Sequence, residues 1–398
     1  MKRFVFSALA LCLLAWATRA QETTARPAAS LLPDISIIGN VVGTLTDAEH
    51  ADIDDHLQLK EVEVVFGAGV YPGIRGDVVI ALHDPDFSAE VEEGYVTIEQ
   101  LSPGVPVGGR LGILRIPFGK VNPVHPHQLP YADTPAAIEN LVGDEFIGNG
   151  FEAVGLIPLP GKLFLQAQVG RWNARAHHHH DDEDWQGSDA TGWWLPEDDD
   201  HHAHRLDFTG TFTVGRLWSG IALRNGSELE LGISRAIGGN VHYDPAIDPA
   251  TNTQRQDADG NLLFERHAPD LRLQGYDVTW RHWLPEGRRI LLQGEYITNT
   301  VVGKSKRSSD GYYLLGAYRP SPFYEFGMRY DWSQAAWPAR SNHPTAETAI
   351  TAFATRQLNE TTYARLQLKH GKDLDGKDYN EATLQVVFGF GPHAHVLQ

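Results

Sequence analysis

Residues 323–332 read FYEFGMRYDW and alternate large apolar side chains with polar or small ones. The apolar set is Tyr324, Phe326, Met328, Tyr330 and Trp332, and the other set is Glu325, Gly327, Arg329 and Asp331. Because successive side chains of a β-strand point to opposite faces, the pattern predicts a strand with one apolar and one polar face. A soluble β-sandwich would also bury such a face, so this strand alone leaves the fold open.

The same alternation recurs along the chain, and this repetition reduces the number of folds that fit the sequence. It is found in residues 163–169, 206–214, 364–369 and 382–390. Almost no helical periodicity separates these segments, and we expect one short helix near residues 135–141. The sequence therefore predicts an all-β protein whose strands continue to the end of the chain.

The connections between these segments alternate between short and long. Short ones lie at 71–73, 159–161, 285–287, 320–322 and 358–360. Long polar ones lie at about 44–56, 85–91, 119–148, 175–203, 238–268, 301–310, 334–345 and 372–378. Long loops at one end and short turns at the other are typical of transmembrane β-barrels. Eight long loops and seven short turns predict an antiparallel barrel of sixteen strands between about residues 33 and 391. Residues 213–227 could contain either one turn or an extra hairpin, so the number of strands could differ from sixteen by two. A large sandwich or propeller is the competing fold.

The first twenty residues have the pattern of a secretory signal peptide. Lys2 and Arg3 precede an uncharged apolar run, and Thr18-Arg19-Ala20 offers a small-x-small cleavage site. We therefore expect a signal peptide at 1–20 and a single barrel domain at 21–398, in the bacterial outer membrane. The one cysteine, Cys12, falls in the signal peptide, which excludes disulfides and thiolate metal sites from the mature chain.

The mature chain is strongly acidic. The net charge of the whole chain is −18, and losing Lys2, Arg3 and Arg19 without any acid leaves −21. Nucleic acid is therefore an unsuitable partner, whereas cations are suitable ones. No G-x-S-x-G or H-E-x-x-H motif is found, so we predict that the protein is not an enzyme and requires no cofactor.

The fourth long connection concentrates histidine and acid. The candidate metal ligands in it are His177, His178, His179, His180, Asp181, Asp182, Asp184, Asp198, Asp199, Asp200, His201, His202 and His204. Imidazole and carboxylate are the usual zinc ligands where thiolate is absent. Such clustering predicts loose capture of zinc or another divalent cation at the cell surface. The alternative is a solvated acidic loop without a specific ligand.

A second candidate metal site lies in the third long connection. His125 and His127 are spaced so that an extended backbone would project both rings to one side. An acid from the same loop would complete three ligands, and Asp133, Glu139, Asp144 and Glu145 are the candidates. If the strand count holds, this is the loop that folds into the lumen of many porins. The alternative is an ordinary loop with a surface histidine.

Several short segments resemble one group of bacterial proteins. They are residues 33–40, 57–66, 91–95, 117–122 and 125–130. Together they look like the zinc-regulated outer-membrane proteins, which are porin-type barrels similar in architecture to phosphate-selective porins and are often labelled TonB-dependent receptors. The resemblance implies induction under zinc limitation and a role in zinc passage. Because barrel strands are expected from about Asp34, we expect no plug domain before them.

These observations predict an outer-membrane, porin-like channel for small solutes. The solute would include zinc or other divalent cations, captured by outer loops rich in histidine and acid. The expected partners are membrane lipid, divalent metal ions and, as in many porins, two further copies of the chain. The alternative from another class is a non-conducting barrel that displays a metal-binding or adhesive loop.

Overall fold

A computed structural model describes most of the barrel. The described residues are 33–48, 57–84, 87–102, 104–143, 145–159, 163–175, 210–239, 242–245, 247–248, 253–254, 264–267, 270–302, 306–336 and 345–391. The predicted signal peptide lies outside these residues.

Sixteen long strands form the barrel. They are β1 (Asp34–Thr46), β2 (Leu57–Tyr71), β3 (Ile74–His83), β4 (Ser88–Ile98), β5 (Val107–Arg115), β6 (Ile147–Pro158), β7 (Leu163–Ala174), β8 (Gly210–Ala222), β9 (Ser227–Gly239), β14 (Asp270–Trp283), β15 (Arg289–Val302), β16 (Lys306–Ser321), β17 (Tyr324–Gln334), β18 (Ala346–Gln357), β19 (Tyr363–Lys372) and β20 (Asp378–Phe390). Four short strands between β9 and β14 form two small separate sheets: β10 (His242–Pro245), β11 (Ile247–Asp248), β12 (Thr253–Gln254) and β13 (Phe264–His267).

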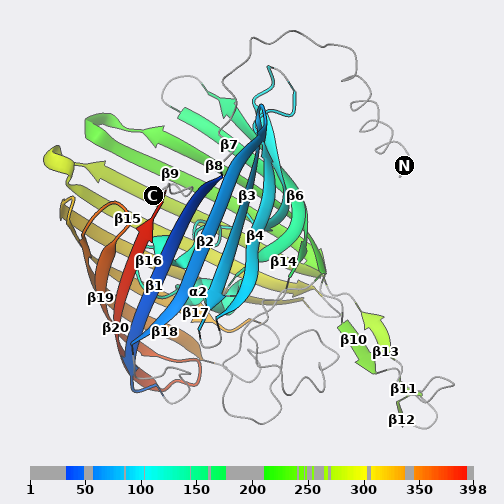
Figure 1. Ribbon diagram of the computed structural model, residues 1–398. Helices are drawn as coiled ribbons and strands as arrows, with labels where there is room; N and C mark the ends of the chain where they lie inside the picture. The colour runs from blue at the N-terminus through cyan, green and yellow to red at the C-terminus, as the bar shows by residue number, and fades with distance from the viewer. Residues whose placement is uncertain are drawn as a thin grey trace.

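The barrel is closed by its first and last strands. β1 pairs antiparallel with β20 from Ile37 opposite Phe390 to Thr46 opposite Glu381. Every other neighbouring pair is also antiparallel and consecutive in the ring, so Figure 1 shows one continuous tilted wall of strands. The predicted sixteen-stranded barrel is confirmed. The doubtful segment 213–227 contains a single tight turn, the 3-10 turn η3 (Arg224–Gly226), and no extra hairpin.

Strand β17, which contains the alternating residues 324–332, has its apolar side on the outer surface. Met328 is 59% exposed, whereas Arg329 and Asp331 beside it are 1% and 0% exposed. Strands β19 and β20 follow the same rule, with Leu366 and Phe390 exposed. Aromatic and aliphatic side chains outside and polar ones inside are the arrangement of a barrel in lipid. Among the described residues, no helix is long and apolar enough to cross a membrane.

The first part of strand β8 reverses this rule. Phe212 and Val214 are fully buried on the inner side, whereas Thr211 and Thr213 are exposed on the outer side. The inward apolar side chains of β8 pack on a loop inside the barrel, and Phe146 of that loop meets Phe212 edge to face. The interior on this side of the barrel is therefore packed with apolar side chains.

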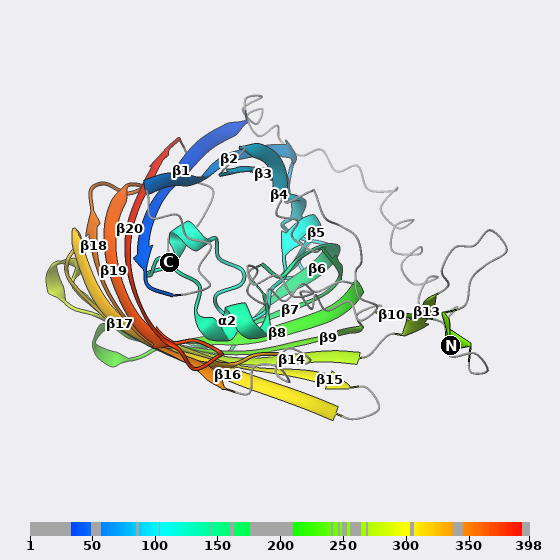
Figure 2. The same ribbon diagram turned by 90° about the horizontal axis from the view of Figure 1, so that it is seen from below.

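The loop in question connects β5 to β6 and spans residues 116–146; we call it the inner loop. It contains the 3-10 turn η2 (Pro126–Gln128) and the helix α2 (Ala136–Leu141), which is the helix expected near 135–141. α2 packs against β15, β16 and β17. Figure 2 shows α2 inside the ring of strands, as predicted for the third long loop.

Candidate functional site

The inner loop is closed at its base by one side chain. The amide nitrogen of Asn122 donates to the carbonyl oxygens of Ile116 and Phe146, at 2.8 and 2.9 Å. Its amide oxygen accepts from the backbone N–H of Phe146 at 2.9 Å. The loop therefore leaves and rejoins the wall at a single point, and the residues between are free to cross the interior.

Beyond this base the loop first reaches β9 and β15. The backbone N–H of Gly119 donates to Ser234 Oγ at 3.0 Å. The backbone N–H of Lys120 donates to Glu295 Oε1 at 3.0 Å, and Lys120 Nζ lies 2.6 Å from Glu230 Oε2. In the order of the ring, β9 and β15 are roughly opposite β2 and β4. The chain then turns back toward β2 and β4.

Strand β19 holds the turn that carries the two histidines. The hydroxyl of Tyr363 donates to the carbonyl oxygen of His127 at 2.5 Å. The guanidinium of Arg365 donates to the carbonyl oxygen of Leu129 at 2.9 Å. Both bonds reach backbone atoms of η2 or of the residue after it, so the backbone that carries the two imidazoles is attached to the wall.

The two imidazoles converge on one carboxylate. Glu63 Oε1, from β2, lies 3.2 Å from His125 Nδ1 and 3.0 Å from His127 Nδ1. The other ring nitrogen of His125, Nε2, lies 3.3 Å from Glu93 Oε2 on β4. All four side chains are buried, and the ring centroids of the histidines are 5.6 Å apart. His125, His127 and Glu63 thus form a compact group with one candidate ligand atom each.

A β-bulge places two consecutive carboxylates on the inner side of β4. Val79 of β3 pairs with Glu93, whereas the next residue, Ile80, pairs with Val91, so Glu92 has no opposite residue. Glu92 and Glu93 are 2% and 5% exposed. In a regular strand one of them would face outward. A bulge re-aims a side chain in this way, and the site gains a carboxylate that strict alternation would have placed in lipid.

The structure corrects two details of the sequence prediction. The backbone is extended at His125, but Pro126–Gln128 is a 3-10 turn and not an extended stretch. The acid that joins the histidines comes from β2 and not from their own loop. Asp133 binds Arg329, Glu145 pairs with Arg115, and Glu139 is exposed. The remaining candidate, Asp144, lies outside the described residues.

Sequence reasoning did not single out Glu63 and Glu93 as site residues. The available signal was the acidic alternation Glu61-Val62-Glu63 within a strand, which places both carboxylates on one face. The histidine- and acid-rich segment from His177 to His204 lies outside the described residues, so its metal-binding role stays a prediction.

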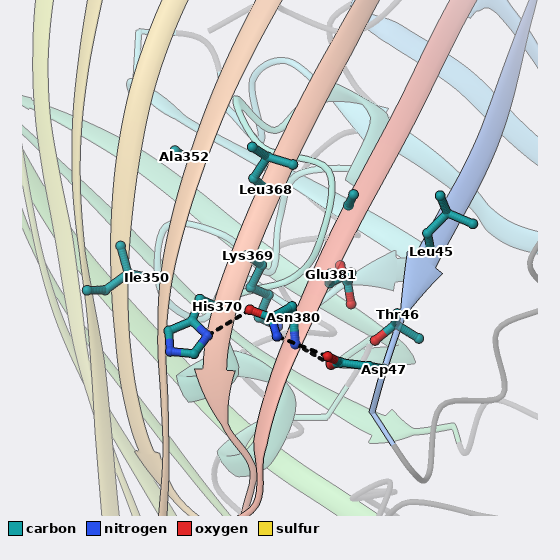
Figure 3. Close-up of a pocket in the computed structure, with 11 residues that line it drawn as sticks. Leu45, Thr46, Asp47, Ile350, Ala352, Leu368, Lys369, His370, Asn380 and Glu381 are labelled. Atoms are coloured by element: carbon teal, nitrogen blue, oxygen red, sulfur yellow. Dashed lines mark hydrogen bonds between the residues drawn. The ribbon is translucent and has the colours of Figure 1, made fainter.

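A separate groove lies on the outer wall near the long-loop end of β1, β18, β19 and β20. It has a volume of about 520 Å³ and is lined by exposed apolar side chains that include Leu45, Ile350 and Leu368. At its polar end, His370 Nδ1 lies 3.0 Å from Asn380 Oδ1, as Figure 3 shows. The groove faces away from the interior and contains none of the predicted site residues.

No protein-family model matches the chain. An uncharacterised protein of Aquifex aeolicus strain VF5 is 28% identical over 123 residues, which is 30% of this chain. The match spans only 25% of the length of that relative.

Solved structures of outer-membrane proteins match nearly the whole chain. OprB of Pseudomonas putida has a TM-score of 0.56 at 11% identity, over 90% of this chain and 94% of its own. An anion-selective porin from Comamonas acidovorans has a TM-score of 0.52 at 11% identity, over 90% and 100%. The outer membrane channel DcaP of Acinetobacter baumannii has 0.51 at 12% identity, over 92% and 100%. At such identities the likeness concerns the fold alone, and the chain has the closed, sixteen-stranded fold of outer-membrane porins.

Proposed function

We propose that this protein is an outer-membrane channel for small solutes that admits zinc or other divalent cations. The histidine- and acid-rich loop collects the ion at the surface, and the group Glu63, His125 and His127 binds it inside the barrel. The single observation that carries the proposal is the convergence of two buried imidazoles on one buried carboxylate oxygen. The resemblance to zinc-regulated outer-membrane proteins supports the same choice of ion.

The spacing of the candidate ligand atoms suits zinc. Two ligands bound at about 2.0–2.1 Å in a tetrahedral arrangement lie about 3.3 Å apart. The distances from Glu63 Oε1 to the two Nδ1 atoms are 3.2 and 3.0 Å, so a small movement would admit an ion between them. Glu63 Oε2 is also buried and has no hydrogen-bond partner among the described residues. Three protein ligands would leave a fourth position for water, which suits an ion that must leave again.

Protons compete with the metal for the same nitrogens. Burial by itself would lower the pKa of His125, but the carboxylate of Glu63 raises that pKa well above the usual value for histidine. A metal ligand must be neutral imidazole, so an arriving cation displaces a proton. The transport step is binding and diffusion, without a chemical reaction.

The acidic charge of the chain and its apolar outer surface support the rest of the proposal. A net charge of −18 attracts cations to the protein. Exposed side chains such as Met328 and Leu366 give the outer wall the character of a surface in lipid, which supports a place in the bacterial outer membrane. Assembly as a trimer stays a prediction.

The test is ion current through the refolded mature protein in a planar bilayer, with micromolar zinc added to the side of the long loops. We expect stepwise conductance that zinc reduces. His127→Gln should raise the zinc concentration for half-reduction at least about tenfold, since loss of a ligand removes more than the 10–100-fold effect of an outer-shell contact. His370→Gln, on the outer wall, is the matched control and should leave the response unchanged.

The same measurement separates the competing function. The inner loop packs an apolar cluster into the interior, which also suits a barrel that does not conduct. A silent barrel that still binds zinc would replace the channel with a surface metal-binding protein. If wild type and His127→Gln conduct with equal zinc sensitivity, the buried group does not lie on the path of the ion.

A further inference from the structure

A second group of metal-ligand side chains lies beside the first. It consists of Glu61 on β2, His83 on β3 and Glu92 on β4, whose candidate ligand atoms all lie within 4.8 Å of one another. From this placement we infer that the wall formed by β2–β4 carries two divalent-cation sites, one after the other on the path from the long loops. The outer site consists of Glu61, His83 and Glu92, and the inner site consists of Glu63, His125 and His127. The inference rests on the proposed function and extends it.

The strand register orders the two groups along the wall. β2 runs from Leu57 at the long-loop end to Tyr71 at the turn end, so Glu61 lies closer to the long loops than Glu63. Glu61 pairs directly with His83, which is the last residue of β3 at that same end. The side chain of His83 is 26% exposed, whereas those of His125 and His127 are 2% and 3% exposed. An ion that enters from the long loops would therefore meet the outer group first.

Glu92 connects the two groups. Its Oε1 lies 3.9 Å from His83 Nε2, and its Oε2 lies 3.6 Å from His125 Nδ1. Glu92 is the bulged residue of β4 and is 2% exposed, and its Oε2 has no hydrogen-bond partner among the described residues. One carboxylate can thus contact an ion at either site, which is how neighbouring sites hand over an ion without fully releasing it.

The charge of the cluster is compatible with two divalent ions. Its nine side chains are Glu61, Glu63, His83, Glu92, Glu93, Arg115, His125, His127 and Glu145. If all five carboxylates are ionised and the histidines are neutral, the guanidinium of Arg115 leaves a charge of −4. Buried charge is costly unless it is compensated. Two divalent cations would neutralise the cluster with its histidines in the neutral form that binds metal, whereas one would leave it at −2.

Two adjacent sites also suit passage better than one. A single tight site would hold its ion, whereas repulsion between neighbouring ions weakens both and favours release. The expected spacing is on the order of 7 Å, since alternate residues of a strand are about 6.6 Å apart.

The test is anomalous diffraction from crystals of the full mature chain soaked in zinc chloride. We expect two peaks on the β2–β4 wall, one in each group. His83→Gln should remove the outer peak and keep the inner one, and His127→Gln should do the reverse. Glu61→Gln gives a second variant of the outer group in case His83→Gln does not fold, and heat-modifiable electrophoretic mobility reports folding of each.

The outcomes separate this inference from the proposed function. A single peak at the inner group would overturn the second site and leave the proposed function standing. A single peak at the outer group would overturn the inference that two sites follow one another along the wall. Absence of both peaks, with the cluster held together by protonated histidines, would overturn the second site and the inner site of the proposed function together.

Discussion

Arg329 on β17 donates two hydrogen bonds to Asp133 of the inner loop. Its guanidinium donates to the carbonyl oxygen of Asp133 at 3.0 Å and to its carboxylate at 2.9 Å. Lys369 lies 3.2 Å from the same carboxylate. Burial by itself would raise the pKa of Asp133, but the charges of Arg329 and Lys369 hold that pKa below its usual value. One ionised side chain is therefore among the groups that hold the inner loop to the wall.

Asp133→Asn should loosen the inner loop. The substitution removes a charge-assisted contact, and hydrogen bonds to charged groups contribute about 1.5–3 kcal/mol. We expect more frequent fluctuations of the open-channel current, measured on single channels. Glu325→Gln breaks the 2.8 Å pair with Arg289 near the turn end and is the matched control. Equal noise in both variants would show that Asp133 does not hold the loop.

Gly119→Ala should destabilise the attachment of the loop to β15. Gly119 has a φ of 67°, and a Cβ atom there would overlap Oε1 of Glu295, the oxygen that accepts from Lys120. The left-handed backbone alone costs a non-glycine residue about 1–2 kcal/mol. The measurement is the urea midpoint of unfolding in lipid vesicles. Gly215→Ala is the control, because its Cβ would lie 3.8 Å from the nearest atom. Equal midpoints for the two variants would contradict the expectation.

Deleting Glu92 should leave the barrel folded. Because Glu92 has no opposite residue on β3, its removal restores regular pairing, with Val91 still outward and Glu93 still inward. Deleting Leu366 from the regular strand β19 should instead turn Gln367 and Lys369 toward lipid and impair folding. Heat-modifiable electrophoretic mobility reads out both. If the two deletions had the same effect, the assignment of the bulge to Glu92 would be wrong.

Met328→Arg should impair insertion into lipid. Met328 is 59% exposed on the outer wall, and arginine on the lipid face of a barrel costs about 2–4 kcal/mol at the membrane midplane. The folded fraction after dilution into vesicles is the measurement, and Met328→Leu is the control. Insertion of the arginine variant as efficient as that of wild type would argue against contact between this face and lipid.

The number of strands could be predicted from the sequence because it depends on local features. Turn residues such as Pro285 and Gly287, and alternation such as that of 323–332, are each encoded within a few positions. Alternation alone does not say which face is outside, however. Phe212 and Val214 look like lipid-facing residues until the inner loop is seen to pack on them.

Of the residues that form the site, only the two histidines could be predicted from the sequence. His125 and His127 are neighbours in the chain, whereas Glu63 lies 62 residues before His125. That contact depends on the register of β2 to β4 and on the path of the inner loop. The inward position of Glu92 depends on a bulge, which breaks the alternation on which strand prediction relies. Loop acids near the histidines were natural candidates, yet Arg329 and Arg115 bind two of them.

The path of the inner loop has a mechanical consequence. Lys120 is bound to Glu295 on β15, and five residues later His125 is bound to Glu63 on β2, on roughly the facing side of the ring. The segment between them connects both walls and contains a turn, in which the N–H of Val124 donates to the carbonyl oxygen of Val121 at 2.9 Å. Lateral pressure in the membrane that pushed these two walls apart would have to open this turn, so the cross-section of the barrel should resist becoming oval.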